Sequence, residues 1–208
     1  FTEDLQPKPQ DPYGIAKFAS EQTLSVLSKV HKFNYVNLVP HNIIGPRQKY
    51  DDPYRNVVSI MINRVLNGKP PIIYGDGNQE RCFSDIDDVV EPLIKSIFSE
   101  DAINQTINIG PDEDVITINQ LAEKVLKVLN SDLEPIHVDP RPQEVKLAHC
   151  SANKARKILG YKTEVTLDDS IKKIADWIIK MGPKKFRYHL DLEVLNESTP
   201  ETWKKKLF

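Results

Sequence analysis

The 208-residue sequence predicts an α/β fold, and two observations lead to that prediction. A segment with helical periodicity, from Pro12 to about His31, is followed at once by a short apolar run typical of a buried strand. Helical and strand segments then continue to alternate along the chain, which indicates a sheet covered by helices rather than a helix bundle.

The first helix has a clear start. Asp11 is a plausible N-cap, and Pro12 suits the first helical position. The helix is apolar over a wide arc that includes Val26 and Val30, which is typical of a helix buried against a sheet and also against a partner. The strand that follows is expected within residues 33–42.

Cap and turn residues predict the remaining elements. Asn56 can cap a second helix, and Thr117 with Gln120 forms a capping-box pattern for another. We expect helices at 57–66, from 85 or 87 to 97, and at 118–129, 151–160 and 166–178, with strands at 72–74, 81–84, 106–109 and 136–138. The charged tail beyond Gly182-Pro183 either packs on the body or hangs free.

Composition excludes several classes of protein. A net charge of -2 argues against nucleic acid or an anionic membrane as the main partner. No apolar run approaches the roughly 20 residues of a membrane span, no signal peptide opens the chain, and no Cys/His spacing is typical of a metal site. Two cysteines, Cys82 and Cys150, favour a reducing, cytoplasmic setting. Because the first residue is Phe1, we expect the C-terminal portion of a longer protein.

Tyr13 and Lys17 are the first candidate catalytic residues. They stand four residues apart on the predicted helix, so the phenol and the ammonium share one face. A cation beside a phenol favours the phenolate and so makes a tyrosine a usable general base. An ordinary surface pair on an amphipathic helix is the alternative.

Several short motifs follow one another in a recognisable order. They are Pro12-Tyr13-Gly14-x-x-Lys17, Asn42-Ile43-Ile44-Gly45-Pro46-Arg47-Gln48, Tyr74-Gly75-Asp76-Gly77-x-Gln79-x-Arg81, Asn108-Ile109-Gly110, Arg141-Pro142-x-Glu144 and Leu159-Gly160-Tyr161. Over roughly residues 1–180 this order resembles the C-terminal two thirds of NAD-dependent nucleotide-sugar epimerases and dehydratases, a family of extended short-chain dehydrogenases/reductases.

The resemblance implies the C-terminal part of a Rossmann-type parallel sheet plus a smaller α/β substrate-binding domain. It assigns residues 1–50 and 77–110 to the NAD-binding domain, 51–76 and 111–183 to the substrate domain, and 184–208 to a tail. The family's Gly-rich phosphate loop and the Ser/Thr partner of its tyrosine are absent from this sequence. We therefore expect these residues alone to bind NAD weakly or not at all and to be inactive.

The resemblance also implies roles at the cofactor. Tyr13 would be the general acid/base on a sugar hydroxyl, and Lys17 would bond the nicotinamide-ribose hydroxyls. Pro40 and His41 would end the strand that approaches the nicotinamide. His41 departs from the aromatic residue or Asn more usual there, and a space-filling rim residue is the alternative.

For the nucleotide sugar, the resemblance implies six residues whose ordinary structural roles remain open. Asn42 would donate to the diphosphate or else form a turn, while Arg81 and Arg141 would grip the diphosphate or ribose or else be solvated. A fork of donors suits phosphate oxygens. Glu144 would bond a ribose hydroxyl, and Ile72 and Tyr74 would flank the base or form plain core strand.

The function implied is an NAD-dependent epimerase that oxidises a UDP-sugar hydroxyl to a transient keto-sugar and returns hydride to the opposite face. A 4,6-dehydratase or decarboxylase is an alternative within the family. A non-catalytic nucleotide-sugar or dinucleotide-binding module is an alternative outside enzymes, although a pure binder has no use for the Tyr13/Lys17 pair. The wide apolar arc of the first helix predicts a homodimer.

Overall fold

The computed structural model describes residues 1–142, 144–191 and 195–208, which form two compact units. The first unit comprises Phe1–Ile43, Cys82–Asp114 and His149–Glu164, and the second comprises Ile44–Arg81, Val115–Ala148 and Val165–Phe208. The helices are α1 (Pro12–His31), α2 (Val57–Leu66), α3 (Ile86–Phe98), α4 (Ile118–Val128), α5 (Asn153–Leu159), α6 (Leu167–Met181) and α7 (Glu201–Lys204), with a 3₁₀ turn at Glu100–Ala102. The strands are β1 (Val36–Pro40), β2 (Ile43–Ile44), β3 (Ile72–Tyr74), β4 (Glu80–Arg81), β5 (Ser84–Asp85), β6 (Gln105–Ile109), β7 (Ile116–Thr117), β8 (Ile136–Val138) and β9 (Leu147–Ala148).

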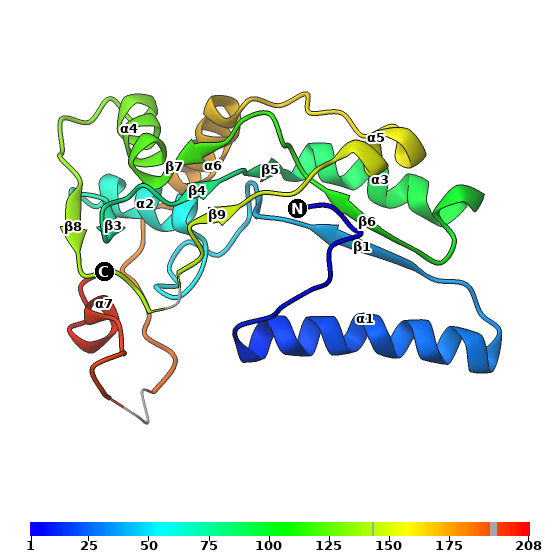
Figure 1. The fold of residues 1–208 in the computed structure, drawn as a ribbon. Coiled ribbons are helices and arrows are strands. Elements are labelled where there is room, and N and C mark those ends of the chain that lie inside the picture. Colours follow the sequence, from blue (N-terminus) through cyan, green and yellow to red (C-terminus); the bar gives the residue numbers. More distant parts are fainter. Residues whose placement is uncertain (143, 192–194) are drawn as a thin grey trace. The chain divides into compact units, whose positions relative to one another are not determined.

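A parallel pair of strands, β1 and β6, is the centre of the first unit. Val36 pairs with Gln105 and Pro40 with Ile109, so both strands end at the same edge. Helices α3 and α5 lie on one side of this pair and α1 on the other (Figure 1). The buried core lies beneath α3 and α5 and consists of Val89, Ala102, Ile107, Ile109, Ala152, Ala155, Leu159 and Tyr161.

Helix α1 begins as the sequence predicts, but none of its residues is buried. The Asp11 carboxylate accepts a hydrogen bond from the Gly14 amide at 2.8 Å, which caps the first turn. The Thr106 hydroxyl on β6 donates to Glu21 at 2.7 Å. Val26 and Val30 are exposed, so the expected burial of the apolar arc against a sheet does not occur within this chain.

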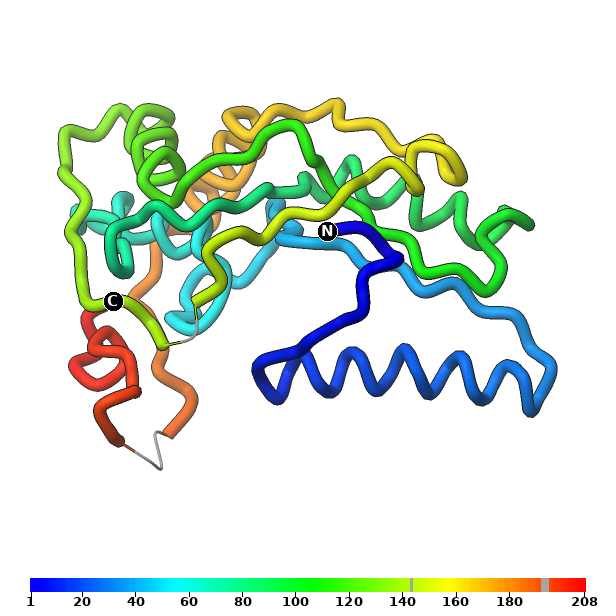
Figure 2. Tube along the Cα trace, in the orientation of Figure 1, coloured from blue at the N-terminus to red at the C-terminus, as the bar shows by residue number. Residues whose placement is uncertain are grey.

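The N-terminal residue is fixed to the segment that follows β9. The Phe1 ammonium donates to the His149 carbonyl at 3.0 Å, and the Ser151 amide donates to the Phe1 carbonyl at 2.8 Å (Figure 2). The Glu3 carboxylate accepts from the Asn108 amide on β6. The approach segment to α1 is therefore part of the first unit.

The second unit is built on α2, α4 and α6, which pack against one another around a core of branched side chains. Helix α2 is buried from Val58 to Val65, as expected for an apolar helix without a solvent face. Strands β3 and β8 pair in parallel, whereas β4 pairs with β7 antiparallel and with β9 in parallel. No helix in the described part of the chain is both long and apolar enough to cross a membrane.

The predicted α/β class is confirmed, and α1, α2, β3 and β8 have the expected bounds. The expected strand at 81–84 is instead two short strands, β4 and β5, separated by Cys82 and Phe83. The described residues of the tail pack on the second unit, which decides between the two alternatives left open. Residues 149–164, which the sequence assigns to the substrate domain, pack with the first unit. Which unit binds the cofactor and which binds the substrate stays a prediction.

Candidate active site

Tyr13 and Lys17 share one face at the start of α1, as their spacing predicts. Pro12 and the Asp11 cap fix the first turn, which carries the phenol. The Lys17 Nζ atom lies 5.6 Å from the centre of the Tyr13 ring. The Tyr13 side chain is 72% exposed, so its hydroxyl is accessible. The pair offers a phenol and a cation side by side to an incoming ligand.

Pro40 and His41 lie where β1 ends beside β6. The His41 amide donates to the Ile109 carbonyl at 3.2 Å, which continues the ladder one residue past Pro40. The next residue on the other strand is Gly110, with a φ of +148°. A Cβ atom there would come within 2.5 Å of the His41 ring and 2.6 Å of the Ser84 hydroxyl, so the ring packs where only glycine leaves room.

The His41 ring has one bonded and one unbonded nitrogen. Its Nε2 lies 3.4 Å from the Pro111 carbonyl, which can only accept, so this contact assigns the ring proton to Nε2. The buried Nδ1 has no hydrogen-bond partner in the described part of the chain. Burial lowers the pKa of His41, against the opposing effects of the Pro111 carbonyl and Asp112. The neutral ring thus presents a buried acceptor beside the end of β1.

Asn42 forms a turn in this structure. Its φ is +46°, in the left-handed region that Asn tolerates better than most residues. Its side-chain amide donates to the Cys82 carbonyl at 2.8 Å, and its own carbonyl accepts from the Ser84 amide at 3.1 Å. These bonds match the turn role that the sequence left open, and the expected bond to a diphosphate stays a prediction.

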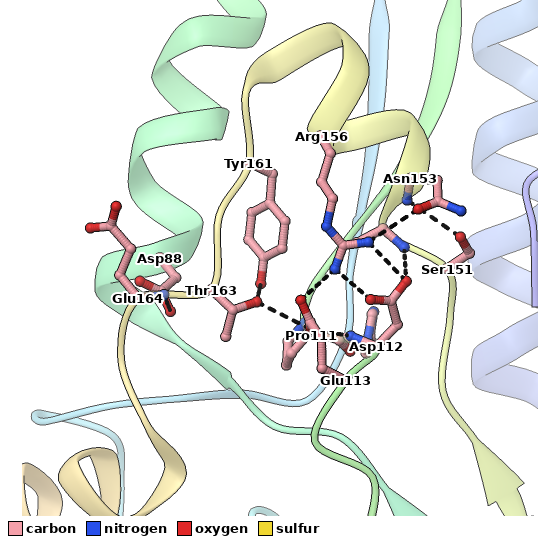
Figure 3. A network of polar contacts seen from close by, with 12 residues as sticks. Asp88, Pro111, Asp112, Glu113, Ser151, Asn153, Arg156, Tyr161, Thr163 and Glu164 are labelled. Carbon is pink, nitrogen blue, oxygen red and sulfur yellow. Dashed lines mark hydrogen bonds and ion pairs between the residues drawn. The ribbon is translucent and has the colours of Figure 1, made fainter.

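A polar network holds the loop that carries Pro111 (Figure 3). Asp112 accepts from the Ala152 amide at 2.8 Å and from two nitrogens of Arg156 at 3.2 and 2.5 Å. The same guanidinium donates to Glu113 at 2.6 Å, and Glu113 also accepts from Thr163 at 3.4 Å. The loop after β6 is therefore tied to α5, which keeps the Pro111 carbonyl next to His41.

Arg81, Arg141 and Glu144 come together in the second unit, as expected from the sequence. Glu144 accepts from Arg141 at 2.7 Å and lies 3.6 Å from an Arg81 nitrogen. Burial lowers the pKa of the Arg81 guanidinium and Glu144 opposes this effect, but an arginine stays charged at any ordinary pH. Two guanidinium groups against one carboxylate leave a positive site, which suits an anion.

Tyr74 belongs to the same cluster, and Ile72 does not. The Arg141 guanidinium lies over the Tyr74 ring, 4.6 Å from its centre, in the geometry of a cation–π contact. Ile72 is buried in β3 and has the core-strand role that the sequence left open. Burial raises the pKa of the Tyr74 phenol, which the Thr202 hydroxyl and Arg141 oppose. The phenol is thus protonated and can act as a hydrogen-bond donor.

The candidate residues form two groups, one in each unit. The first unit carries Tyr13, Lys17, Pro40, His41 and Asn42, and the second carries Ile72, Tyr74, Arg81, Arg141 and Glu144. Sequence reasoning missed Thr202, whose hydroxyl is bonded to that of Tyr74. Its only signal was the nearby Trp203 in a charged tail. Within residues 1–142, 144–191 and 195–208, no group of His, Cys, Asp or Glu side chains could hold a metal ion.

Comparison with known proteins gives consistent results. Residues 1–110 match the model of the NAD dependent epimerase/dehydratase family. The chain is 31% identical to a putative UDP-glucose 4-epimerase of Methanocaldococcus jannaschii, over 82% of this chain and 54% of that protein. It is 30% identical to a UDP-N-acetyl-alpha-D-glucosaminuronate decarboxylase of Bacillus cytotoxicus, over 65% of this chain and 43% of that protein.

A solved structure shares the fold. The crystal structure of UDP-glucose 4-epimerase from Thermotoga maritima with UDP-glucose superposes with a TM-score of 0.81 at 32% identity, over 87% of this chain and 57% of that chain. The chain belongs to the NAD dependent epimerase/dehydratase family and has part of its Rossmann-type fold. It spans about half the length of the curated relatives it matches.

Proposed function

We propose that the full-length protein is an NAD-dependent epimerase that inverts a hydroxyl-bearing carbon of a UDP-sugar. One observation of the structure carries the proposal: the Tyr13/Lys17 pair lies on one exposed face of α1, with Lys17 Nζ 5.6 Å from the phenol ring. The similarity to UDP-glucose 4-epimerases supports the choice of reaction. We further propose a homodimer and a cytoplasmic setting, as predicted from the sequence.

The residues present fit the nicotinamide-ribose end of NAD. An exposed ammonium next to an exposed phenol is a suitable partner for the ribose hydroxyls. The sequence has no Gly-rich phosphate loop ahead of Tyr13, the motif that binds a pyrophosphate at a helix N-terminus. NAD, when bound, provides the acceptor for hydride from the sugar carbon.

The chain's own residues handle the proton and the orientation. Tyr13 takes the proton of the sugar hydroxyl while hydride leaves the carbon that bears this hydroxyl. After the keto-sugar has turned over and hydride has returned to its opposite face, Tyr13 gives the proton back. Lys17 supplies positive charge beside the phenol and bonds the ribose. In the second unit, Arg81 and Arg141 bind the diphosphate. Glu144 gives up part of its contact with Arg141 and accepts a hydrogen bond from a ribose hydroxyl instead.

Turnover of UDP-glucose by the full-length protein tests this proposal. We expect UDP-galactose as the product, and we expect Tyr13→Phe to lower kcat by about 10²- to 10⁴-fold, the usual contribution of a general acid/base. Binding of UDP by calorimetry should be unchanged in that variant. Tyr35→Phe, at the entry to β1, is the matched control and should keep wild-type activity.

Two results contradict the proposal. Near-normal turnover by Tyr13→Phe would remove the proton-transfer role from this phenol. A dehydrated product from UDP-glucose, or a decarboxylated product when a UDP-hexuronic acid is supplied instead, would assign the protein to an alternative reaction of the family, and the similarity to the Bacillus cytotoxicus decarboxylase is the reason for the second assay.

A further inference from the structure

The C-terminal tail is fastened to the second unit by its backbone. Both polar atoms of the buried Asn63 amide bond the Lys184 backbone, at 2.8 Å to its carbonyl and 3.0 Å from its amide. The buried Arg64 guanidinium donates to the Leu207 carbonyl at 2.7 Å. A tail held at both ends by buried side chains of α2 is a built part of the unit.

Aromatic side chains fill the space between these two attachments. The Tyr54 ring makes edge contacts with Tyr188, His189 and Trp203, with ring centres 6.2, 5.4 and 5.2 Å away. The Tyr188 hydroxyl accepts a hydrogen bond from the Phe208 amide at 2.9 Å. Edge-to-face contacts of this kind each stabilise by about 0.5–1.5 kcal/mol beyond the area they bury. The contact with Trp203 is the one that holds α7 against Tyr54.

Helix α7 makes one contact with the candidate site. Thr202 is fully buried, and its hydroxyl is hydrogen-bonded to the hydroxyl of Tyr74. The ring of the same Tyr74 side chain lies against the Arg141 guanidinium, which is 4.6 Å from the ring centre. Arg141 in turn bonds Glu144 at 2.7 Å. A continuous chain of contacts thus runs from the tail to the arginine that is expected to bind the diphosphate.

We propose that Thr202 is a positioning residue for the nucleoside-diphosphate site, which it acts on by fixing the Tyr74 ring under Arg141. This inference rests on the proposed function, because it takes Arg141 and Tyr74 as ligand-binding residues. A hydrogen bond at the hydroxyl restrains the χ1 angle of Tyr74, so the ring cannot swing out from its place against Arg141. The Arg141 guanidinium is then already oriented for the diphosphate before the ligand binds, so this side chain loses less conformational freedom on binding.

Replacement of the hydroxyl alone tests the role of Thr202. In the full-length protein, Thr202→Val keeps the shape and removes the hydrogen bond, while Thr202→Ser keeps the bond. We expect the Kd for UDP, measured by calorimetry, to rise about tenfold in Thr202→Val, the loss of one buried hydrogen bond. Thr202→Ser should stay within about twofold of wild type. KM for the nucleotide sugar should rise with Kd while kcat changes little, because Tyr13 and Lys17 are in the other unit.

Two further variants separate this inference from its alternatives. Tyr188→Phe removes the bond to the Phe208 amide and keeps Thr202 on Tyr74, so it should bind UDP like wild type. An effect of Tyr188→Phe as large as that of Thr202→Val, or unchanged UDP binding by Thr202→Val, overturns the inference. Arg141→Ala tests the site itself: if it leaves UDP binding unchanged, the proposed function fails at this site. If only Arg141→Ala weakens binding, the site stands and the role of Thr202 is refuted.

Discussion

Asp112 has three hydrogen-bond donors within reach, and it is the most strongly held carboxylate of the first unit's loop network. The Arg156 guanidinium and the Ala152 amide lower its pKa, with the hydrogen bond from Arg156 as the largest cause. A carboxylate whose pKa is lower in the folded state stabilises that state whenever it is ionised. The network also keeps the Pro111 carbonyl beside His41, so its strength bears on the candidate site.

We predict that Asp112→Asn destabilises the first unit by about 1–2 kcal/mol at neutral pH, the value of a charge-assisted bond reduced for partial exposure. Because the pKa is lowered, this difference should be complete above the ordinary Asp value of about 4. It should disappear as the pH falls through the folded-state pKa. Amide hydrogen exchange of β6 at several pH values measures it.

Glu91→Gln is the matched control for Asp112→Asn. The pKa of Glu91 is also lowered, by Lys95 at 2.7 Å, but that ion pair is on the open surface of α3. Solvent screens such a pair, so exchange in β6 should change little. A difference between Asp112→Asn and wild type that persists at the lowest pH would show that shape, and not charge, is what the substitution removes.

At the scale of elements, the sequence predicts the long helices, which have a repeating apolar pattern, and misses the strands of two residues. Helices α1, α2 and α4 have caps and an apolar period over ten or more residues, so their bounds follow from residues such as Asp11 and Thr117. Strands β7 and β9 have two residues each. No period exists over two residues, and these strands form only because β4 offers a pairing edge from a distant part of the chain.

The turn after β3 provides a test of local geometry. Gly77 has a φ of +73°, and an added Cβ would meet the Asn119 amide at 2.0 Å. That amide donates to the Asp76 carbonyl at 2.9 Å, so a side chain at position 77 both strains the backbone and displaces a cap of the turn. We predict that Gly77→Ala lowers the free energy of unfolding by about 2–3 kcal/mol.

Gly68→Ala isolates the backbone part of that effect. Its φ is +71°, and an added Cβ would meet nothing within 4 Å. We expect a loss of about 1 kcal/mol from the left-handed conformation alone. Trp177 and Trp203 both belong to the second unit, so denaturation followed by tryptophan fluorescence reports on it. Equal losses in the two variants would mean that Asn119 moves aside without cost.

At the scale of the whole molecule, motif order predicts which of the candidate residues lie together in the second unit, and it does not predict what surrounds them. Arg81, Arg141 and Glu144 meet as expected because motif order along the chain carries that information. The contact of Thr202 with Tyr74 joins residues 128 positions apart, across a charged tail with no motif of its own. Only tertiary packing brings those two hydroxyls together, so no local pattern could have predicted it.

The exposed apolar stripe of α1 leads to the last prediction, that the full-length protein is a dimer through this helix. At 100° per residue, Ile15, Val26 and Val30 fall within one narrow arc. Glu21, which bonds Thr106 on β6, and the Tyr13/Lys17 pair point well away from that arc. The stripe therefore faces away from this chain's sheet, and a second copy could cover it by helix-to-helix packing.

Paired substitution of Val26 and Val30 by Glu should convert that dimer to a monomer in sedimentation, because two charges cannot be buried in an apolar interface without partners. Ser20→Glu adds a charge on a different face of α1 and should stay dimeric. The first turn with Tyr13 lies more than two turns from Val26, so UDP binding should survive in the monomer. A wild-type protein that sediments as a monomer, or a double variant that remains dimeric, would rule out α1 as the interface.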